Sequence, residues 1–239
     1  MKDTSVTLDS IQQAAGRLRN VSHVTPVLTS QFLNNRSGNT VFLKAEHLQR
    51  VGAFKFRGAQ NALSQLSNEE LKTGVATQSS GNHAQALALA ASLKNVPAYI
   101  VMPENAPTPK IAAVRGYGAE ITFCQPIIQE RERRLATIQK TTGATYIPPY
   151  NHPSIISGQG TIGLELLEQI SDLEVVIAPV GGGGLLSGVA TAIKAHNPKI
   201  QVYGAEPTGA DDAARSLRAG KLIPQEAPNT IADGLLTSL

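Results

Sequence analysis

The chain of 239 residues is long enough for one large or two modest domains with hydrophobic cores. Its net charge of +3 is mild and its basic residues are scattered, which argues against a nucleic-acid-binding surface. The single cysteine, Cys124, excludes an intramolecular disulfide and any multi-cysteine metal site, and its apolar neighbours indicate a buried thiol. No apolar stretch resembles a signal peptide or a membrane helix, so we expect a cytoplasmic protein.

Strands and helices alternate along most of the sequence. An amphipathic helix that Thr7 could cap covers residues 7–18, the chain is extended before Pro26, and a strand at 41–45 leads to a helix at 56–66. Further strands are predicted at 75–77, 98–102, 120–123, 145–147, 175–180 and 200–205, and further helices at 82–93, 108–117, 127–141, 160–171 and 185–196. This alternation predicts an α/β fold of parallel βαβ units, with helices on both faces of the sheets.

The pattern predicts two α/β domains with a cleft between them. Residues 175–180 form a continuous apolar run, which is typical of a strand buried on both faces. The proline-rich residues 148–153 are expected to cross from one sheet to the other. We expect residues 1–70 and 152–239 to form a larger domain, and residues 71–151 a smaller one.

Lys55 stands between Phe54 and Phe56, in the sequence Gly-Ala-Phe-Lys-Phe-Arg-Gly. Aromatic neighbours can desolvate an ammonium group and lower its pKa, which favours a neutral, nucleophilic amine. The glycine at position 52 suits a tight turn before the lysine. On these residues alone, an exposed lysine at a helix N-terminus is the alternative.

Four glycines, Gly181, Gly182, Gly183 and Gly184, join the apolar strand at 175–180 to the next helix. Without side chains the backbone can wrap an anion, and the following helix N-terminus adds N–H donors and a favourable dipole. Neither a Walker lysine nor a spaced Gly-x-Gly-x-x-Gly is present, so a small phosphate monoester fits better than a nucleotide. The alternative is a flexible turn.

Polar side chains also follow the strand at 75–77, in the sequence Ser79-Ser80-Gly81-Asn82-His83. The carboxyl ends of strands are where α/β proteins bind ligands, although a serine or asparagine here could simply cap the next helix. A nucleophilic lysine and a phosphate cradle together describe pyridoxal phosphate, an aldehyde that carries a phosphate and forms a Schiff base with lysine.

Two carboxylates, Glu206 and Asp212, lie in a loop after the last predicted strand. Carboxylates and loop carbonyls are hard oxygen ligands that suit Mg²⁺ or Ca²⁺. Capping of a helix by Asp211 and Asp212 is the alternative, and spacing alone favours it.

The sequence resembles the fold type II pyridoxal-phosphate enzymes, and within them the branch of threonine/serine dehydratases and serine racemases. Residues 44–49, followed by Gly-Ala-Phe-Lys-Phe-Arg-Gly-Ala, resemble the cofactor-lysine region, and Ser-Ser-Gly-Asn-His-Ala-Gln resembles the substrate loop. Further matches occur in family order, from about residue 7 to the end of the chain. They are Ser-Gly-Gln-Gly-Thr-Ile-Gly at 157–163, the four glycines, Ala-Glu-Pro at 205–207 and Ile-Ala-Asp-Gly at 231–234.

The resemblance implies a role for each matching residue. Lys55 would hold the cofactor and act as the base on the substrate's Cα–H, and Ser80 occupies the position of the opposite-face proton donor in racemases. The cofactor would also contact Phe54, Asn82, Asn151, Gly181, Gly182, Gly183, Gly184, Leu185 and Gly234. The substrate carboxylate would be held by Ser79, Ser80, Asn82 and His83. A divalent metal ion, Mg²⁺ or Ca²⁺, would be bound by Glu206, the Ala210 carbonyl and Asp212.

The chain departs from the family pattern in two places. Ala53 stands where the family usually has serine, and the chain stops at Leu239, where family members continue. We therefore expect the larger domain to lack its last part and to expose a sheet edge and core surface. The regulatory domain of the dehydratases of isoleucine biosynthesis is absent too, so no isoleucine feedback is expected.

The expected activity is dehydration and deamination of L-threonine and L-serine to 2-oxobutanoate or pyruvate, plus ammonia. Serine racemisation is the alternative within the family, and a truncated, inactive cofactor-binding homologue is the alternative outside enzymes. Cysteine synthase-like chemistry fits less well, because that branch has Thr-Ser-Gly-Asn-Thr where this chain has Ser-Ser-Gly-Asn-His. By resemblance the protein would act on a small amino acid as a homodimer.

Overall fold

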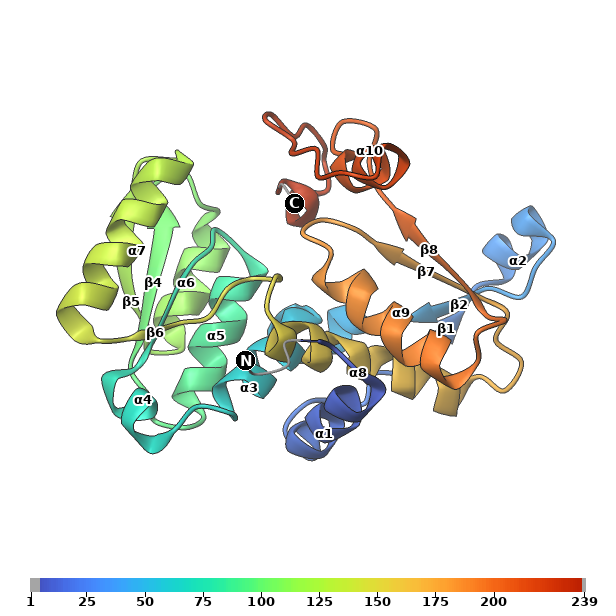
Figure 1. Ribbon diagram of the computed structural model, residues 1–239, viewed down its shortest axis with the longest axis horizontal. Coiled ribbons are helices and arrows are strands. Elements are labelled where there is room, and N and C mark those ends of the chain that lie inside the picture. Colours follow the sequence, from blue (N-terminus) through green and yellow to red (C-terminus); the bar gives the residue numbers. More distant parts are fainter. Residues whose placement is uncertain (1–4, 238–239) are drawn as a thin grey trace.

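The computed structural model describes residues 5–237 and contains three separate sheets (Figure 1). The strands are β1 (Val27–Thr29), β2 (Phe42–Lys44), β3 (Val75–Gln78), β4 (Ala98–Pro103), β5 (Glu120–Cys124), β6 (Thr145–Tyr146), β7 (Val175–Pro179) and β8 (Gln201–Ala205). The α-helices are α1 (Leu8–Leu18), α2 (Gln31–Ser37), α3 (Lys55–Leu63), α4 (Asn68–Thr73), α5 (Asn82–Ser92), α6 (Thr108–Gly116), α7 (Ile128–Thr142), α8 (Pro153–Gln169), α9 (Gly184–His196) and α10 (Asp212–Ala219). Three short 3₁₀ turns are η1 (Glu46–Leu48), η2 (Arg50–Gly52) and η3 (Asp233–Leu235).

The largest sheet has the strand order β5-β4-β3-β6, and all of its neighbouring strands are parallel. Helix α5 packs on one face through buried alanines, and α7 covers the other face, where Leu135 and Ile138 join Val101. Cys124 is buried there, as its apolar neighbours predicted. The parallel α/β arrangement is therefore confirmed. Strands β1 and β2 form a separate antiparallel pair.

Strands β7 and β8 form a two-stranded parallel sheet. The prediction that residues 175–180 are buried on both faces is wrong. Val176 and Ala178 are buried in the core with α9, whereas Val175 and Ile177 are 44% and 67% exposed. Alternate side chains point to opposite faces of a strand, and within the described residues a helix covers only one face of this pair. Val175 and Ile177 thus form exposed apolar surface on the other face; whether the larger domain lacks its last part stays a prediction, and residues 238–239 lie outside the described residues.

Helix α8 begins at Pro153, seven residues before the start that the sequence suggested. Proline is well suited to the first position of a helix, and His152 caps this one, its Nδ1 accepting the Ser154 amide at 3.2 Å. The glycines of the Ser-Gly-Gln-Gly-Thr-Ile-Gly motif lie within this helix as contact points. A Cβ at Gly158 would lie 2.7 Å from the Arg57 carbonyl, so glycine allows α8 to pack closely on α3.

The other predicted elements agree with the structure to within about three residues, and Thr7 caps α1 in a capping box. Helices α2, α4 and α10 were not predicted; each is eight residues or shorter. The largest sheet is built from residues inside the predicted smaller domain, but the division into two domains stays a prediction. None of the helices in residues 5–237 is long and apolar enough to span a membrane.

Candidate cofactor site

Lys55 is the first residue of α3, and its amine is largely buried. The amine donates to the Pro149 carbonyl at 2.7 Å and lies 5.3 Å from the centre of the Phe54 ring and 5.7 Å from that of Tyr150. Burial lowers the pKa of Lys55 from 10.5 to about 8. The expectation of a desolvated amine is confirmed, and the exposed-lysine alternative is wrong.

The second aromatic neighbour of the lysine is Tyr150, not Phe56. Consecutive residues of a helix point in different directions, so Phe56 turns away from Lys55. Its ring is fully buried in the core, with the Arg50 guanidinium 5.8 Å from its centre. The sequence pattern did not predict a role for Tyr150, whose only signal was that of an aromatic residue within a proline-rich crossing.

A buried ionic cluster of Lys44, Glu46, Arg57 and Glu165 lies behind the lysine. The Arg57 side chain is fully buried and contacts both carboxylates, Glu46 at 2.8 Å and Glu165 at 2.5 Å. The Lys44 amine contacts Glu165 at 2.6 Å. Burial disfavours the charge on Arg57, but its hydrogen bonds with Glu46 and Glu165 raise its pKa above the ordinary value. The cluster ties the first turn of α3 to α8 and η1, and no local sequence pattern predicted it.

The four glycines, here called the glycine loop, lie between the end of β7 and the start of α9. Gly183 has a φ of +76°, which favours glycine, and caps the helix with its backbone. A Cβ at Gly182 would overlap the Tyr150 ring, and one at Gly184 would lie 2.9 Å from the Tyr150 carbonyl. Tyr150 therefore contacts the glycine loop while its ring faces the Lys55 amine. The lysine and the predicted phosphate cradle belong to one site.

Residues 79–83, here called the 79–83 loop, connect the end of β3 to the start of α5. The N-cap of α5 is Gly81, and within the described residues no side chain caps its first turn. The capping alternative for Ser79, Ser80 and Asn82 is therefore wrong. The first amides of a helix can bind an anion, and the contacts predicted for Ser79, Ser80 and Asn82 with a substrate carboxylate stay predictions.

His83 is buried, and its Nε2 lies 3.0 Å from the Ile147 carbonyl. Burial, reinforced by the nearby charge of Lys55, lowers the pKa of His83 to about 3. The imidazole is thus neutral and donates its Nε2–H to Ile147. Its Nδ1 is buried and has no hydrogen-bond partner among the described residues, and the contact predicted between His83 and a substrate carboxylate stays a prediction.

The C-terminal segment also reaches the site. The Gly234 carbonyl lies 3.6 Å from the position of a Cβ on Gly181, and Thr237 donates to the Tyr150 hydroxyl at 3.3 Å. Asn151 follows Tyr150 and is exposed, and Leu185 is partly buried at the start of α9. The predicted contacts of Asn151, Leu185 and Gly234 with a cofactor stay predictions.

The acidic loop after β8 has a structural role. Both carboxylate oxygens of Glu206 accept backbone amides at the start of α10, from Ala213 at 3.0 Å and Ala214 at 2.7 Å. Glu206 thus performs the capping expected of Asp211 and Asp212, while Asp211 pairs with Arg215 at 2.7 Å. No group of three or more His, Cys, Asp or Glu side chains in residues 5–237 could hold a metal ion. A metal bound by Glu206, Ala210 and Asp212 stays a prediction.

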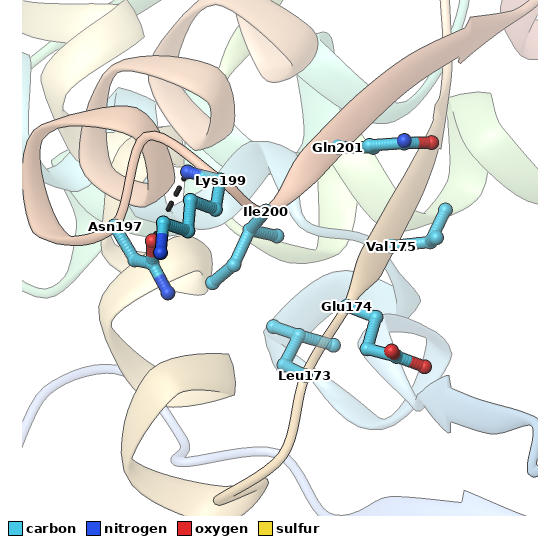
Figure 2. Close-up of a pocket in the computed structure, with 7 residues that line it drawn as sticks. All are labelled: Leu173, Glu174, Val175, Asn197, Lys199, Ile200 and Gln201. Carbon is cyan, nitrogen blue, oxygen red and sulfur yellow. Dashed lines mark hydrogen bonds between the residues drawn. The ribbon is translucent and has the colours of Figure 1, made fainter.

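A cavity of about 380 Å³ lies at the amino ends of β7 and β8, at the other end of these strands from the glycine loop (Figure 2). Its lining includes Val175 and Gln201, the first residues of the two strands, and Lys199, whose amide donates to Asn197 at 3.0 Å. The glycine loop follows the carboxyl end of β7, where parallel sheets bind ligands. The cavity is therefore separate from the candidate site.

A desolvated lysine and a glycine loop that follows a strand both lie against Tyr150. The residues present fit pyridoxal phosphate: the amine for the aldehyde, and the side-chain-free loop and helix start for the phosphate. Residues 19–238 match the family model described as "Pyridoxal-phosphate dependent enzyme". The chain belongs to this family.

Individual relatives show which group within this family the chain is most similar to among those compared. The chain is 51% identical to a serine racemase of Arabidopsis thaliana over 96% of its own length and 70% of that protein. The structure of maize serine racemase matches with a TM-score of 0.96 and 48% identity, over 98% of this chain and 71% of that one. A threonine deaminase from Solanum lycopersicum matches with a TM-score of 0.89 and 39% identity, over 99% of this chain and 70% of that one. The fold is thus that of the fold type II enzymes, in the serine racemase and ammonia-lyase group.

Proposed function

We propose that the chain binds pyridoxal phosphate at Lys55 and interconverts L-serine and D-serine. The observation that carries the proposal is the desolvated Lys55 amine, held by the Pro149 carbonyl in a site that also contains the glycine loop. The similarity to plant serine racemases supports racemisation ahead of the L-threonine dehydration that the sequence favoured.

Each residue has a distinct task in this proposal. The glycine loop and the first turn of α9 bind the cofactor's phosphate through backbone amides, with Leu185 and Gly234 beside them. Phe54, Asn82 and Asn151 contact the cofactor's ring system. The amides at the start of α5, with Ser79 and Ser80, hold the substrate carboxylate and so orient its Cα–H toward the Lys55 amine.

In this proposal the Lys55 amine and the Ser80 hydroxyl transfer the proton at the substrate's Cα. Bound pyridoxal phosphate supplies an electron sink for the negative charge that remains at Cα when its proton leaves. The Lys55 amine, neutral above its pKa of about 8, accepts the proton on one face. Ser80 donates its hydroxyl proton to the opposite face, which inverts the configuration. Both groups then exchange protons with solvent.

β-Elimination is the second candidate, because the same first proton transfer precedes it. If the β-hydroxyl leaves as water before Ser80 reprotonates Cα, the product hydrolyses to pyruvate and ammonia. L-threonine would give 2-oxobutanoate by the same steps. The similarity to a threonine deaminase supports this branch.

The test incubates the cofactor-loaded chain with L-serine and measures D-serine by chiral chromatography and pyruvate by a coupled assay. We expect D-serine, with pyruvate as a second product, and neither from Lys55→Ala. Replacing Ser80 by Ala should abolish D-serine while pyruvate continues to form. Pyruvate without D-serine from the unmodified chain would favour the elimination branch, and neither product would contradict the proposed function.

A further inference from the structure

Lys110 and Asp233 form an ion pair between segments that are 123 residues apart in the sequence. Lys110 is in the first turn of α6, beside the largest sheet, and Asp233 begins η3 in the C-terminal segment. The Lys110 side chain is only 22% exposed and that of Asp233 67%. The Lys110 ammonium holds the pKa of Asp233 below its usual range, so the carboxylate is charged at neutral pH.

Each partner of the pair lies against a different part of the candidate site. A Cβ on Gly81 would lie 3.1 Å from the Lys110 amine, so the ammonium rests directly on the 79–83 loop. Directly after Asp233, the carbonyl of Gly234 lies 3.6 Å from the position of a Cβ on Gly181. The C-terminal segment therefore contacts the glycine loop, and the ion pair extends that contact to the 79–83 loop.

We propose that Lys110 and Asp233 are positioning residues that hold the 79–83 loop against the C-terminal segment. The inference rests on the proposed function in one respect: it takes the 79–83 loop to bind the substrate carboxylate. Holding the loop would keep the first amides of α5 at a fixed position relative to Lys55. A glycine at position 81 is what allows the ammonium to approach the loop backbone.

The expected effect is modest, because a partly exposed ion pair contributes little energy. We expect a change of about three- to fivefold in substrate affinity when the pair is broken. The chemical step should change less, since neither side chain contacts the Lys55 amine in the structure. An effect on KM with a nearly constant kcat distinguishes a positioning role from general destabilisation.

The test reverses the charges one at a time and then together, with Lys110→Asp, Asp233→Lys and the double variant. Hydrogen exchange of the amides of residues 79–85 is measured on the chain without cofactor or substrate. KM and kcat for L-serine are measured on the loaded enzyme. The control is Lys72→Asp, which breaks the exposed pair of Lys72 with Glu69 on α4.

Each single reversal should speed exchange of these amides and raise KM about three- to fivefold, and the double variant should restore both. The control variant should change neither the amide exchange nor KM. Unchanged exchange in the single variants, or a double variant that fails to recover, would overturn the inference. If the chain has no activity on L-serine, the proposed function fails, and the exchange data still decide whether the pair holds the loop.

Discussion

The two sides of Lys55 are built in different ways. Behind it lies the ionic cluster, in which the buried Arg57 is enclosed by Glu46 and Glu165. In front of it lie the 79–83 loop and the glycine loop, which offer backbone amides and few bulky side chains. The first side ties the helix that bears the lysine to α8 and η1, and the second offers glycine backbone packed against Tyr150. Ionic support and backbone amides are thus supplied by separate residues.

The largest expected effect comes from the cluster. Replacing the buried Arg57 by Met leaves two largely buried carboxylates without their main partner, which should lower the free energy of unfolding by about 3 to 5 kcal/mol. Chemical denaturation measures the change. The control, Arg133→Met, breaks the exposed pair of Arg133 with Glu130 and should cost less than about 1 kcal/mol. Equal effects of the two substitutions would contradict the difference between buried and exposed pairs.

The lysine itself should destabilise the chain below pH 8. Its folded pKa of about 8 lies below the ordinary 10.5, so the folded state binds fewer protons between these values and its stability rises with pH across that window. Lys55→Met should therefore be more stable than the unmodified chain by about 3 kcal/mol at pH 7. That advantage should disappear above pH 10.5.

Denaturation of the cofactor-free chain at several pH values tests this expectation. Lys72→Met, at a 71% exposed side chain, is the control and should be about as stable as the unmodified chain at pH 7. A Lys55→Met variant that is less stable at pH 7 would mean that the amine is not desolvated in the folded chain.

The smallest expected effect concerns the glycine loop. Gly182→Ala would place a methyl group in the Tyr150 ring, which should cost about 1 to 3 kcal/mol and weaken cofactor binding. Gly116 in α6 is a matched control, because a Cβ there meets nothing within 4 Å in the structure. Gly116→Ala should stabilise the chain by about 0.5 to 1 kcal/mol. Cofactor titration and denaturation of both variants measure the contrast, and a harmless Gly182→Ala would contradict the packing of Tyr150 on the loop.

The contrast between the ionic cluster and the two loops also explains which parts of the site could be predicted from the sequence. The glycine loop and the 79–83 loop each consist of consecutive residues, so both patterns can be recognised in the sequence. The ionic cluster cannot be recognised in this way, because Arg57 and Glu165 are 108 residues apart and only folding brings them together. Tyr150 was missed for the same reason, since its contact with Lys55 spans the chain from α3 to the crossing before α8.

The fold also divides into features that local sequence patterns predict and features that depend on residues remote in sequence. Periodic apolar residues and capping residues predicted most elements, such as α1 with its Thr7 cap. An apolar run does not reveal how many layers cover a strand, and so the exposure of Ile177 on β7 could not be predicted. The helix predicted from residue 160 begins at Pro153, and the contact of its glycines with α3 depends on partners remote in sequence.

The most direct test of the central claim asks which lysine carries the cofactor. The chain is mixed with pyridoxal phosphate, reduced with borohydride to fix the cofactor covalently, digested and examined by mass spectrometry. The account predicts one modified residue, Lys55, and no fixation at this position in Lys55→Met. Modification spread over exposed lysines such as Lys72, with Lys55 unmodified, would contradict it.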